Sequence, residues 1–403
     1  MPLIRRWLKR ADPAAPALIL PDGEDWSFGA LAGMAGRGGL HAPAGGAAAL
    51  ARGLLDAALG GGTAFPLPPG IEPEAREELL ALAARAAHPD LALIIATSGS
   101  TGAPKGVRLP WRAVAAASRM SARALDLRPG DAWLACLPLY HVGGALIPYR
   151  CLRAGATAVV HEGFDAAAVA RDLAARRVTH LSLVPPMLAR LLDAGIAPGP
   201  ALRCALVGGA ALHDALLERA RAAGWPVRTS WGMSETCATA TVDGVPLPGV
   251  RVRVAAAGTL EIATPARMAG YLGAADAGEW MATRDLGAID ATHADGRVRI
   301  LGRADDMLVS AGVNVHPLEV EARLADCPGV REAGVTGVAD PAWGDVIAAA
   351  YEGEAHEAAL EDWCRAHLPA ARRPRRFLRV ERLPRLASGK LDRRALPALW
   401  GTA

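Results

Sequence analysis

Short apolar runs alternate with amphipathic stretches through the middle of the chain. The apolar runs predict buried strands at Leu91–Thr97, Trp133–Leu137, Ala156–Val160, Val178–Val184, Leu202–Val207 and Val227–Ser230. The stretches between them predict helices at Trp111–Leu125, Ala145–Leu152, Asp165–Arg176, Pro186–Asp193 and Asp214–Ala223. Strands that alternate with helices of this length are typical of βαβ units. We therefore expect an α/β fold of mostly parallel sheets with flanking helices.

The two flanks of this region have different patterns. Before residue 91, strands are predicted at Ala17–Leu20 and Phe65–Pro69, and helices at Trp26–Met34, Gly45–Leu59 and Glu74–Ala87. Residues 245–302 predict short β segments with Gly and Pro turns. A small α+β pattern follows, with helices at Pro317–Ala325 and Ala358–His367 and strands at Val330–Val338 and Arg376–Val380. These patterns predict a large N-terminal domain, residues 1–304, and a small C-terminal domain, residues 305–403.

Composition and charge narrow the class of protein. The 403 residues are 52% hydrophobic, which excludes a mostly disordered chain. The formal net charge of +3 provides no strong field, so no nucleic-acid partner is expected. Residues 371–394 hold nine Arg, one Lys and two acids. Such a run predicts either a solvated surface or a contact with a polyanion or nucleotide.

No segment has the pattern of a secretion signal or a membrane helix. The basic N-terminus is not followed by an apolar region, and Pro and His interrupt the longest uncharged stretch, Ala132–Tyr149. The six cysteines lie far apart, so neither a zinc site nor a disulfide framework is expected. These observations predict a cytoplasmic protein without stable membrane insertion.

Lysine is rare in this chain. Of the 44 basic residues 41 are Arg, and only Lys9, Lys105 and Lys390 are Lys. Lysine offers a compact point charge on a flexible stem, which arginine does not reproduce. Lys105 and Lys390 each follow a glycine-containing loop, so composition alone selects these two positions.

The strongest chemical pattern is the segment Thr97–Gly106, directly after a predicted buried strand. It combines three glycines, four hydroxyl side chains and an ammonium, which suits a polyphosphate. Its candidate ligands are Thr97, Ser98, Gly99, Ser100, Thr101, Gly102 and Lys105. A Walker A loop needs Lys between Gly and Ser or Thr, whereas Lys105 lies between Pro104 and Gly106. The segment therefore predicts a phosphate loop of another kind.

This loop resembles that of the adenylate-forming superfamily, which comprises acyl- and aryl-CoA ligases, adenylation domains and luciferases. Ser230–Thr236, which reads Ser-Trp-Gly-Met-Ser-Glu-Thr, is similar to the family's Tyr-Gly-x-Thr-Glu motif. The resemblance implies that Glu235 holds Mg²⁺ together with Thr97. It also implies a set of nucleotide contacts, in which the indole stacks on adenine: Trp231, Gly232, Ser234, Gly208, Gly209 and Ala210.

Further segments resemble the family's remaining motifs. A Thr-Arg-Asp motif implies that Asp285 binds the ribose hydroxyls. A Gly-Arg-Ala-Asp-Asp motif implies that Arg303 contacts ribose or phosphate and that Asp305 is the hinge between the domains. The next loop, with Gly312, resembles the loop that lines the CoA channel. A Leu-Ala-Ser-Gly-Lys motif implies that Lys390 bridges the substrate carboxylate and the α-phosphate.

The resemblance implies an enzyme that converts a small carboxylic acid and ATP, with Mg²⁺, into an acyl-adenylate and then a CoA thioester. Leu137–Gly144 is similar to the segment in which a histidine gates the acyl pocket. This implies that His141 acts beside Glu235 and Lys390. Several stretches are most similar to o-succinylbenzoate–CoA ligases, which serve menaquinone synthesis. The protein is expected to act as a monomer or homodimer.

Three alternatives remain open from the sequence. The acid can be another acyl or aryl acid, because the motifs specify the nucleotide more than the acid. A stand-alone adenylation enzyme would instead load the thiol of a carrier protein. A non-catalytic nucleotide-binding protein is the third alternative, and its only support is an N-terminal part shorter than the family's pattern.

Overall fold

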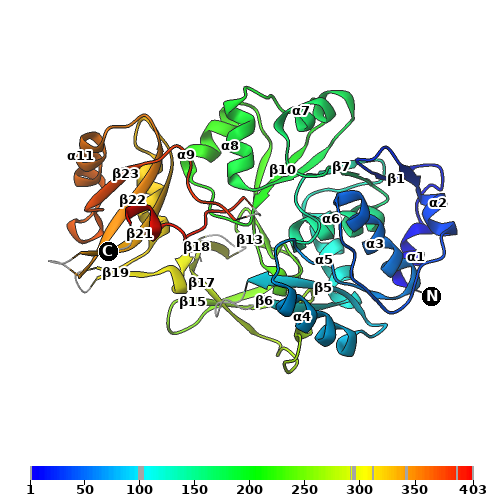
Figure 1. Cartoon of the computed structure of the whole chain (residues 1–403). Helices are drawn as coiled ribbons and strands as arrows, with labels where there is room; N and C mark the ends of the chain where they lie inside the picture. The colour runs from blue at the N-terminus through cyan, green and yellow to red at the C-terminus, as the bar shows by residue number, and fades with distance from the viewer. Residues whose placement is uncertain are drawn as a thin grey trace. The chain divides into compact units, whose positions relative to one another are not determined.

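The computed structural model describes residues 2–98, 104–290, 292, 296–310, 313–340, 344–386 and 389–401. The chain divides into two compact units (Figure 1). Unit 1 comprises Met1–Gly209, Ala223–Arg251 and Ile262–Met281. Unit 2 comprises Ala210–Ala222, Val252–Glu261 and Ala282–Ala403.

A nine-stranded sheet forms the centre of unit 1, in the order β13-β12-β11-β10-β9-β7-β8-β1-β2. Its strands are β1 Pro16–Ile19, β2 Asp25–Ser27, β7 Ala132–Ala135, β8 Thr157–Val160, β9 His180–Leu183, β10 Cys204–Gly208, β11 Val227–Trp231, β12 Thr241–Val242 and β13 Val245–Pro246. The six strands from β11 to β1 run parallel to one another. Every residue of β8 and β9 is buried, as expected for a parallel sheet covered on both faces. The predicted α/β fold is therefore confirmed.

Nine helices precede or connect these strands in the described residues. They are α1 Leu3–Leu8, α2 Phe28–Gly33, α3 Ala47–Gly60, α4 Pro73–Ala86, α5 Trp111–Ala124, α6 Val142–Ala154, α7 Ala166–Ala175, α8 Pro185–Asp193 and α9 Asp214–Ala222. Their ends follow local chemistry: Asp165 caps α7 by accepting from the Ala168 N–H at 2.7 Å, and α3 ends at Gly61 with a φ of 71°. Within the described residues, no helix combines the length and apolarity needed to cross a membrane.

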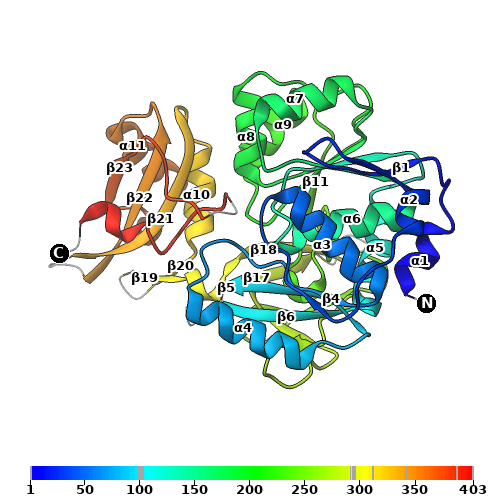
Figure 2. The same ribbon diagram turned by 45° about the vertical axis from the view of Figure 1, so that its right-hand side comes forward.

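A second sheet of unit 1 has the order β16-β6-β5-β4-β3. Its strands are β3 Leu40–His41, β4 Thr63–Ala64, β5 Leu91–Ser98, β6 Pro104–Pro110 and β16 Gly270–Tyr271. Helix α4 packs along β6 (Figure 2). The predicted strand at Phe65–Pro69 is wrong, because strand pairing ends at Ala64 and the prolines that follow carry no N–H for a ladder.

Unit 2 contains most of a sheet in the order β14-β15-β17-β18 and a separate three-stranded sheet. These strands are β14 Arg251–Val254, β15 Thr259–Ala263, β17 Met281–Asp290, β18 Arg297–Arg303, β21 Val330–Asp340, β22 Gly344–Gly353 and β23 Arg376–Arg379. Helices α10 Pro317–Ala325 and α11 Glu357–His367 share a core with β21 and β22, centred on Val320, Val335, Ile347 and Leu360. A pair, β19 Leu308–Ser310 and β20 Val313–Val315, and the short helices η1 Ser234–Thr236, η2 Ala304–Asp306, η3 Ala370–Arg372 and η4 Pro397–Trp400 complete the described elements.

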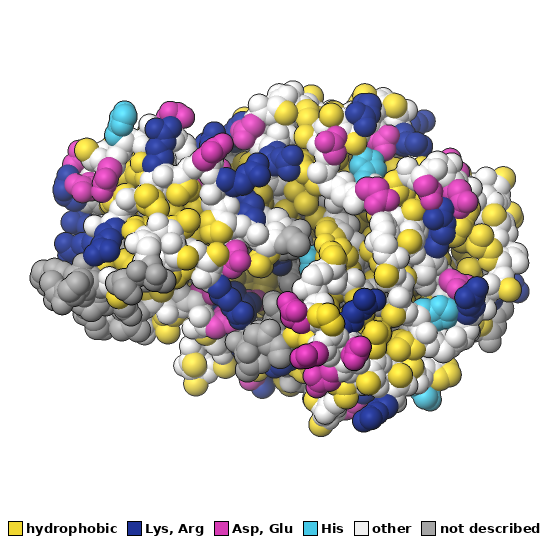
Figure 3. All heavy atoms as spheres, viewed as in Figure 1, with side chains coloured by type: hydrophobic (Ala, Val, Ile, Leu, Met, Phe, Trp, Pro, Cys, Tyr) yellow, Lys and Arg dark blue, Asp and Glu magenta, His cyan; other side chains and the backbone are white. Residues whose placement is uncertain are grey.

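Charged side chains are mixed over the visible surface. On the face in Figure 3, Lys and Arg side chains lie interspersed with Asp and Glu. Parts of the basic run 371–394 are paired with acids inside unit 2, and these pairs are Arg372–Glu319, Arg379–Glu354, Arg385–Glu332 and Arg393–Glu321. The pairs neutralise part of the run's charge and favour the first of the two interpretations given for it, a surface segment.

Candidate active site

Thr97 and Lys105 lie opposite each other on the two strands that flank the phosphate loop. β5 and β6 pair antiparallel, and their register also places Ser98 opposite Pro104. The Thr97 Oγ1 donates to the Lys105 carbonyl oxygen at 3.4 Å. The remaining predicted loop ligands lie outside the described residues, or have a side chain that does: Ser98, Gly99, Ser100, Thr101 and Gly102.

A glycine brings a third strand close to Lys105. A Cβ at Gly106 would lie 2.4 Å from Leu272 Cδ1, so any side chain at this position would have to displace the Leu272 side chain. The Leu272 N–H donates to the Gly106 carbonyl oxygen at 2.8 Å. This close approach leaves the Lys105 Nζ 5.7 Å from the centre of the Tyr271 ring, a cation–π distance.

Tyr271 also binds the predicted magnesium ligand. Its hydroxyl donates to Glu235 Oε1 at 2.8 Å, and the Met268 N–H donates to the Glu235 main-chain oxygen at 2.8 Å. In the described part of the chain, the Glu235 carboxylate has no further hydrogen bond or ion pair, so its second oxygen remains available. Tyr271 is 36 residues from Glu235, and no sequence pattern pointed to it. The pairing of β16 with β6 and the bond of the Met268 N–H to Glu235 bring the two together.

The turn that carries Glu235 depends on a glycine. A Cβ at Gly232 would lie 1.7 Å from the Ala238 carbonyl oxygen, which no side chain permits. The Thr236 hydroxyl lies 3.0 Å from the Met233 N–H and so closes the turn at its other end. Trp231 is the last residue of β11, and Ser234 begins η1. The turn therefore presents Trp231, Gly232, Ser234 and Glu235 from one compact segment.

Four other predicted contacts, Gly208, Gly209, Ala210 and His141, lie at or after the ends of strands. Gly208 ends β10 opposite Ser230, and a Cβ there would lie 2.8 Å from the Ser230 carbonyl oxygen. Gly209 follows with a φ of 81°, and the next residue, Ala210, is exposed. His141 precedes α6, its carbonyl oxygen accepts from the Ala145 N–H at 2.8 Å, and its ring lies 4.7 Å from that of Tyr140.

In unit 2, Asp285 and Arg303 form an ion pair between neighbouring strands. They are register partners on β17 and β18, and Arg303 Nη1 donates to Asp285 Oδ1 at 3.2 Å. Arg303 also donates to both carboxylate oxygens of Asp305, at 2.9 and 3.0 Å, and Arg284 donates to Asp305 at 3.1 Å. Burial opposes the charge of Arg303, but the carboxylates of Asp305, Asp285 and Asp306 together outweigh burial and raise the pKa of Arg303.

Lys390 is held in a tight turn near this ion pair. Arg385 and Leu391 form a β-bridge, the Leu386 N–H donates to the Lys390 carbonyl oxygen at 2.9 Å, and Gly389 has a φ of 81°. Burial and the positive charge of Arg303 lower the pKa of Lys390, and the Asp285 carboxylate opposes that shift. Unit 2 thus brings Lys390, Asp285 and Arg303 within electrostatic reach of one another. Gly312 lies outside the described residues.

Sequence reasoning missed the residues that support this turn. The Arg393 guanidinium donates to both oxygens of Glu321 at 2.6 Å, and the Glu321 carboxylate also accepts from the Val335 N–H at 2.8 Å. Glu321 is only 2% exposed, so its carboxylate is shielded from water. Arg393 lies three residues after Lys390, and the ion pair of Arg393 with Glu321 anchors that segment to α10 and β21.

Glu235 is the residue best placed to hold a metal. In the described residues no group of three or more His, Cys, Asp or Glu side chains is gathered as a metal cage. Mg²⁺ does not need one, because it is bound by one or two carboxylates together with substrate phosphates and water. The available oxygen of Glu235, close to the strands of the phosphate loop, fits this requirement.

Two protein-family models match the chain. The model described as AMP-binding enzyme matches residues 62–272, and the model described as AMP-binding enzyme C-terminal domain matches residues 319–390. Between them they include Lys105, Glu235 and Lys390. The predicted superfamily is therefore confirmed.

Similar proteins match most of the chain. A 2-succinylbenzoate–CoA ligase of Bacillus licheniformis is 36% identical over 337 residues, which cover 76% of this chain and 70% of the relative. A "Probable 2-succinylbenzoate--CoA ligase" of Mycobacterium tuberculosis is 37% identical over 382 residues, which cover 89% of this chain and 97% of the relative. The match thus covers nearly the whole length of that mycobacterial relative.

Solved structures match the fold along nearly the whole chain. The o-succinylbenzoate CoA synthetase of Bacillus subtilis, in complex with the acyl-adenylate intermediate, has a TM-score of 0.83 and 26% identity, with 98% of both chains covered. The same enzyme in complex with ATP and magnesium ion has a TM-score of 0.82 and 26% identity, with 98% of this chain and 99% of that chain covered.

Proposed function

Because the chain belongs to the AMP-binding enzyme family, we propose that it is an ATP-dependent acid–CoA ligase whose acid is 2-succinylbenzoate. The names of the relatives that match 76% and 89% of the chain support this acid. The substrates are then the acid, ATP and CoA, and the product thioester belongs to menaquinone synthesis in the cytoplasm. The oligomeric state consistent with this proposal is a monomer or homodimer.

The observation that carries the ligase proposal is the link from Lys105 through Tyr271 to Glu235. The Lys105 ammonium lies over the ring of Tyr271, and the Glu235 carboxylate accepts from the hydroxyl of the same tyrosine, next to the strands of the phosphate loop. An ammonium binds phosphate oxygens directly, whereas the carboxylate needs a cation to do so. When bound, Mg²⁺ would neutralise part of the negative charge of the phosphates. The arrangement suits a nucleoside triphosphate better than a neutral ligand.

The first half-reaction forms the acyl-adenylate. A carboxylate oxygen of the acid attacks the α-phosphorus of ATP, a P–O bond forms, and pyrophosphate leaves with the electrons of the broken P–O bond. Negative charge builds up on the α-phosphate oxygens, and the Lys390 ammonium stabilises it. Asp285 accepts hydrogen bonds from the ribose hydroxyls, and Arg303 orients the Asp285 carboxylate through their 3.2 Å ion pair. Trp231 provides the stacking surface for adenine.

The second half-reaction transfers the acyl group to CoA. The thiol sulfur attacks the carbonyl carbon, the C–O bond to AMP breaks, and the thiol proton is released. We place a hinge at Asp305, between domains 1–304 and 305–403, because a few residues at the end of an element can absorb the rotation. Asp305 lies in the short helix η2, where Arg303 and Arg284 hold its carboxylate. Rotation there would break those pairs. His141, at the start of α6, gates the acyl pocket.

Pyrophosphate release with Mg-ATP across a panel of acids tests the proposal. We expect release with 2-succinylbenzoate, acceleration by CoA and formation of the thioester. Release with benzoate or a fatty acid instead would move the substrate to another aryl or acyl acid. Release that ignores CoA would point to a carrier-protein thiol. No release with any acid, from protein shown to bind ATP, would refute the ligase proposal.

A further inference from the structure

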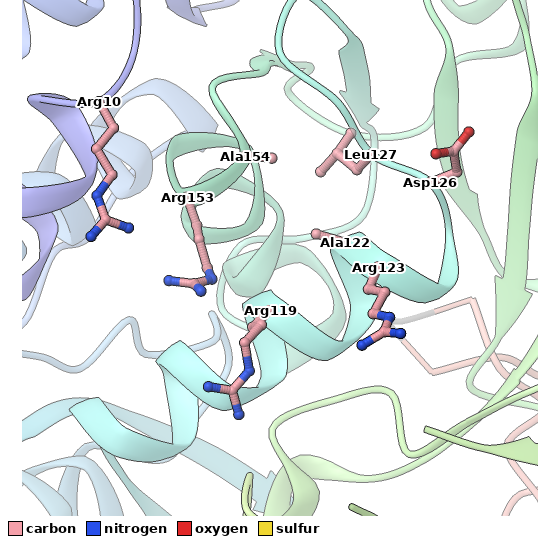
Figure 4. A pocket seen from close by; sticks show the side chains of 8 residues that line it. All are labelled: Arg10, Arg119, Ala122, Arg123, Asp126, Leu127, Arg153 and Ala154. Atoms are coloured by element: carbon pink, nitrogen blue, oxygen red, sulfur yellow. The ribbon is translucent and has the colours of Figure 1, made fainter. Parts of the chain in front are cut away.

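Four arginines line a cavity of unit 1 that is open to solvent and that none of the residues assigned above lines. Arg10 follows α1, Arg119 and Arg123 lie one helical turn apart on α5, and Arg153 lies in the last turn of α6. The cavity has a volume of about 360 Å³. Figure 4 labels these four arginines, which line the cavity from α5, from α6 and from the segment that follows α1.

Within the described residues, no acidic side chain pairs with the arginines of this cavity. Among the described residues, none of the four arginines has an ion pair or a side-chain hydrogen bond. Arg153 instead makes a cation–π contact with the Trp7 ring, whose centre is 5.6 Å away. The one acid in the lining, Asp126, accepts from Arg128 at 2.8 Å and is therefore neutralised elsewhere. Burial, and then the charges of Arg119 and Arg10, lower the pKa of Arg153.

Helix ends explain part of this arrangement but not all of it. α5 and α6 both end beside the cavity, and each C-terminus carries about half a negative charge that a basic side chain offsets. The two helix ends together offset roughly one of the four guanidinium charges. The remaining charges repel one another across the hollow, and an anion would relieve that repulsion.

We propose that this cavity binds a compact anion that carries two or more phosphate groups. Guanidinium groups bind phosphate oxygens in a two-pronged geometry, and four of them suit several oxygens at once. The apolar part of the lining consists of Ala122, Leu127 and Ala154, which offer no aromatic surface for a nucleobase. Arg153 covers the face of the nearby Trp7. A phosphate anion without a base, free or as the headgroup of a lipid, therefore fits better than a nucleotide.

Calorimetric titration of the full chain with inorganic tripolyphosphate tests the proposal. The cavity variant is Arg119→Gln with Arg153→Gln. The matched control is Arg6→Gln with Lys9→Gln, which removes two exposed charges from α1 and its cap but none from the cavity lining. We expect the cavity variant to bind about a hundredfold more weakly, about tenfold for each guanidinium removed, at one class of sites. The control should keep the wild-type isotherm.

The same proteins separate the active site from the cavity and a free anion from a lipid. Pyrophosphate release with ATP should be unchanged in both variants. Sedimentation with vesicles that contain cardiolipin, whose headgroup carries two phosphates, would assign the anion to a lipid headgroup if it is lost only in the cavity variant. Tripolyphosphate binding without sedimentation would assign it to a free anion. Unchanged binding in the cavity variant, or an equal loss in the control, would overturn the proposal.

Discussion

Replacing Tyr271 with phenylalanine tests whether this residue positions the magnesium ligand. The change removes the hydroxyl that donates to Glu235 Oε1 at 2.8 Å and leaves the ring beneath Lys105 in place. A hydrogen bond to a charged group contributes about 1.5 to 3 kcal/mol, which corresponds to about tenfold to hundredfold in rate. Glu235 is half-buried, so water can replace part of the lost bond, and we expect about tenfold.

The expected effect is specific to the nucleotide and its cation. In assays of pyrophosphate release, kcat/KM for ATP should fall about tenfold and the Mg²⁺ concentration for half-maximal rate should rise, whereas KM for the acid should stay unchanged. Tyr271→Leu also removes the ring 5.7 Å from the Lys105 Nζ, and should lose a further two- to fivefold, from about 0.5 to 1 kcal/mol of cation–π interaction.

A second tyrosine of unit 1 provides the control. The Tyr149 hydroxyl is buried and donates to the Leu54 carbonyl oxygen at 3.3 Å, so Tyr149→Phe also deletes a buried hydroxyl but none beside Glu235. It should lower the melting temperature slightly and leave the Mg²⁺ dependence unchanged. A Tyr271→Phe enzyme with wild-type kcat/KM for ATP and wild-type Mg²⁺ dependence would refute the reasoning.

Four further outcomes are expected. Lys390→Ala should reduce pyrophosphate release by at least about a hundredfold with unchanged circular dichroism, since it removes the ammonium from the α-phosphate. The lowered pKa of Lys390 means that the free enzyme loses the charged, active form of Lys390 as pH rises through a value below the ordinary 10.5, so kcat/KM for ATP should fall there; Lys390→Arg should move that alkaline limb upward at a lower overall rate. Gly232→Ala places a Cβ 1.7 Å from a carbonyl oxygen and should destabilise the fold by about 2 kcal/mol or more, whereas Gly278→Ala, with 3.8 Å of room, should leave the melting temperature unchanged. Glu321→Gln breaks the buried pair with Arg393 and should cost about 3 kcal/mol in a denaturant titration.

The regular elements could be predicted from sequence because their hydrophobic periods are strong. The helix expected at Pro317–Ala325 has these bounds in the structure, since Pro317 opens its first turn and apolar residues follow at helical spacing. The strand β6, Pro104–Pro110, was not predicted. Its Pro, Gly, Lys and Arg content obscures a strand period, and it becomes a strand through pairing with β5 on one side and β16 on the other.

The candidate site was predictable in its motifs and not in its contacts. Glu235 and Lys105 stand within recognisable local patterns, whereas Tyr271, which joins them, follows a segment of Gly and Pro turns with no chemical pattern of its own. The same holds for the pair of Glu321 and Arg393, which are 72 residues apart. Such contacts depend on long-range strand and helix packing, which hydrophobic periodicity alone does not specify.

The presence of lysine rather than arginine has a physical explanation at both Lys105 and Lys390. The Lys105 Nζ lies over the ring of Tyr271, where a compact ammonium can interact with the ring and still reach a phosphate oxygen. Lys390 lies where burial and the charge of Arg303 disfavour its charged form. A second guanidinium there would stay charged at every pH and would compete with Arg303 for Asp285. A lysine can enter this crowded region as a single point charge, and the phosphate that arrives with ATP then restores the preference for its protonated form.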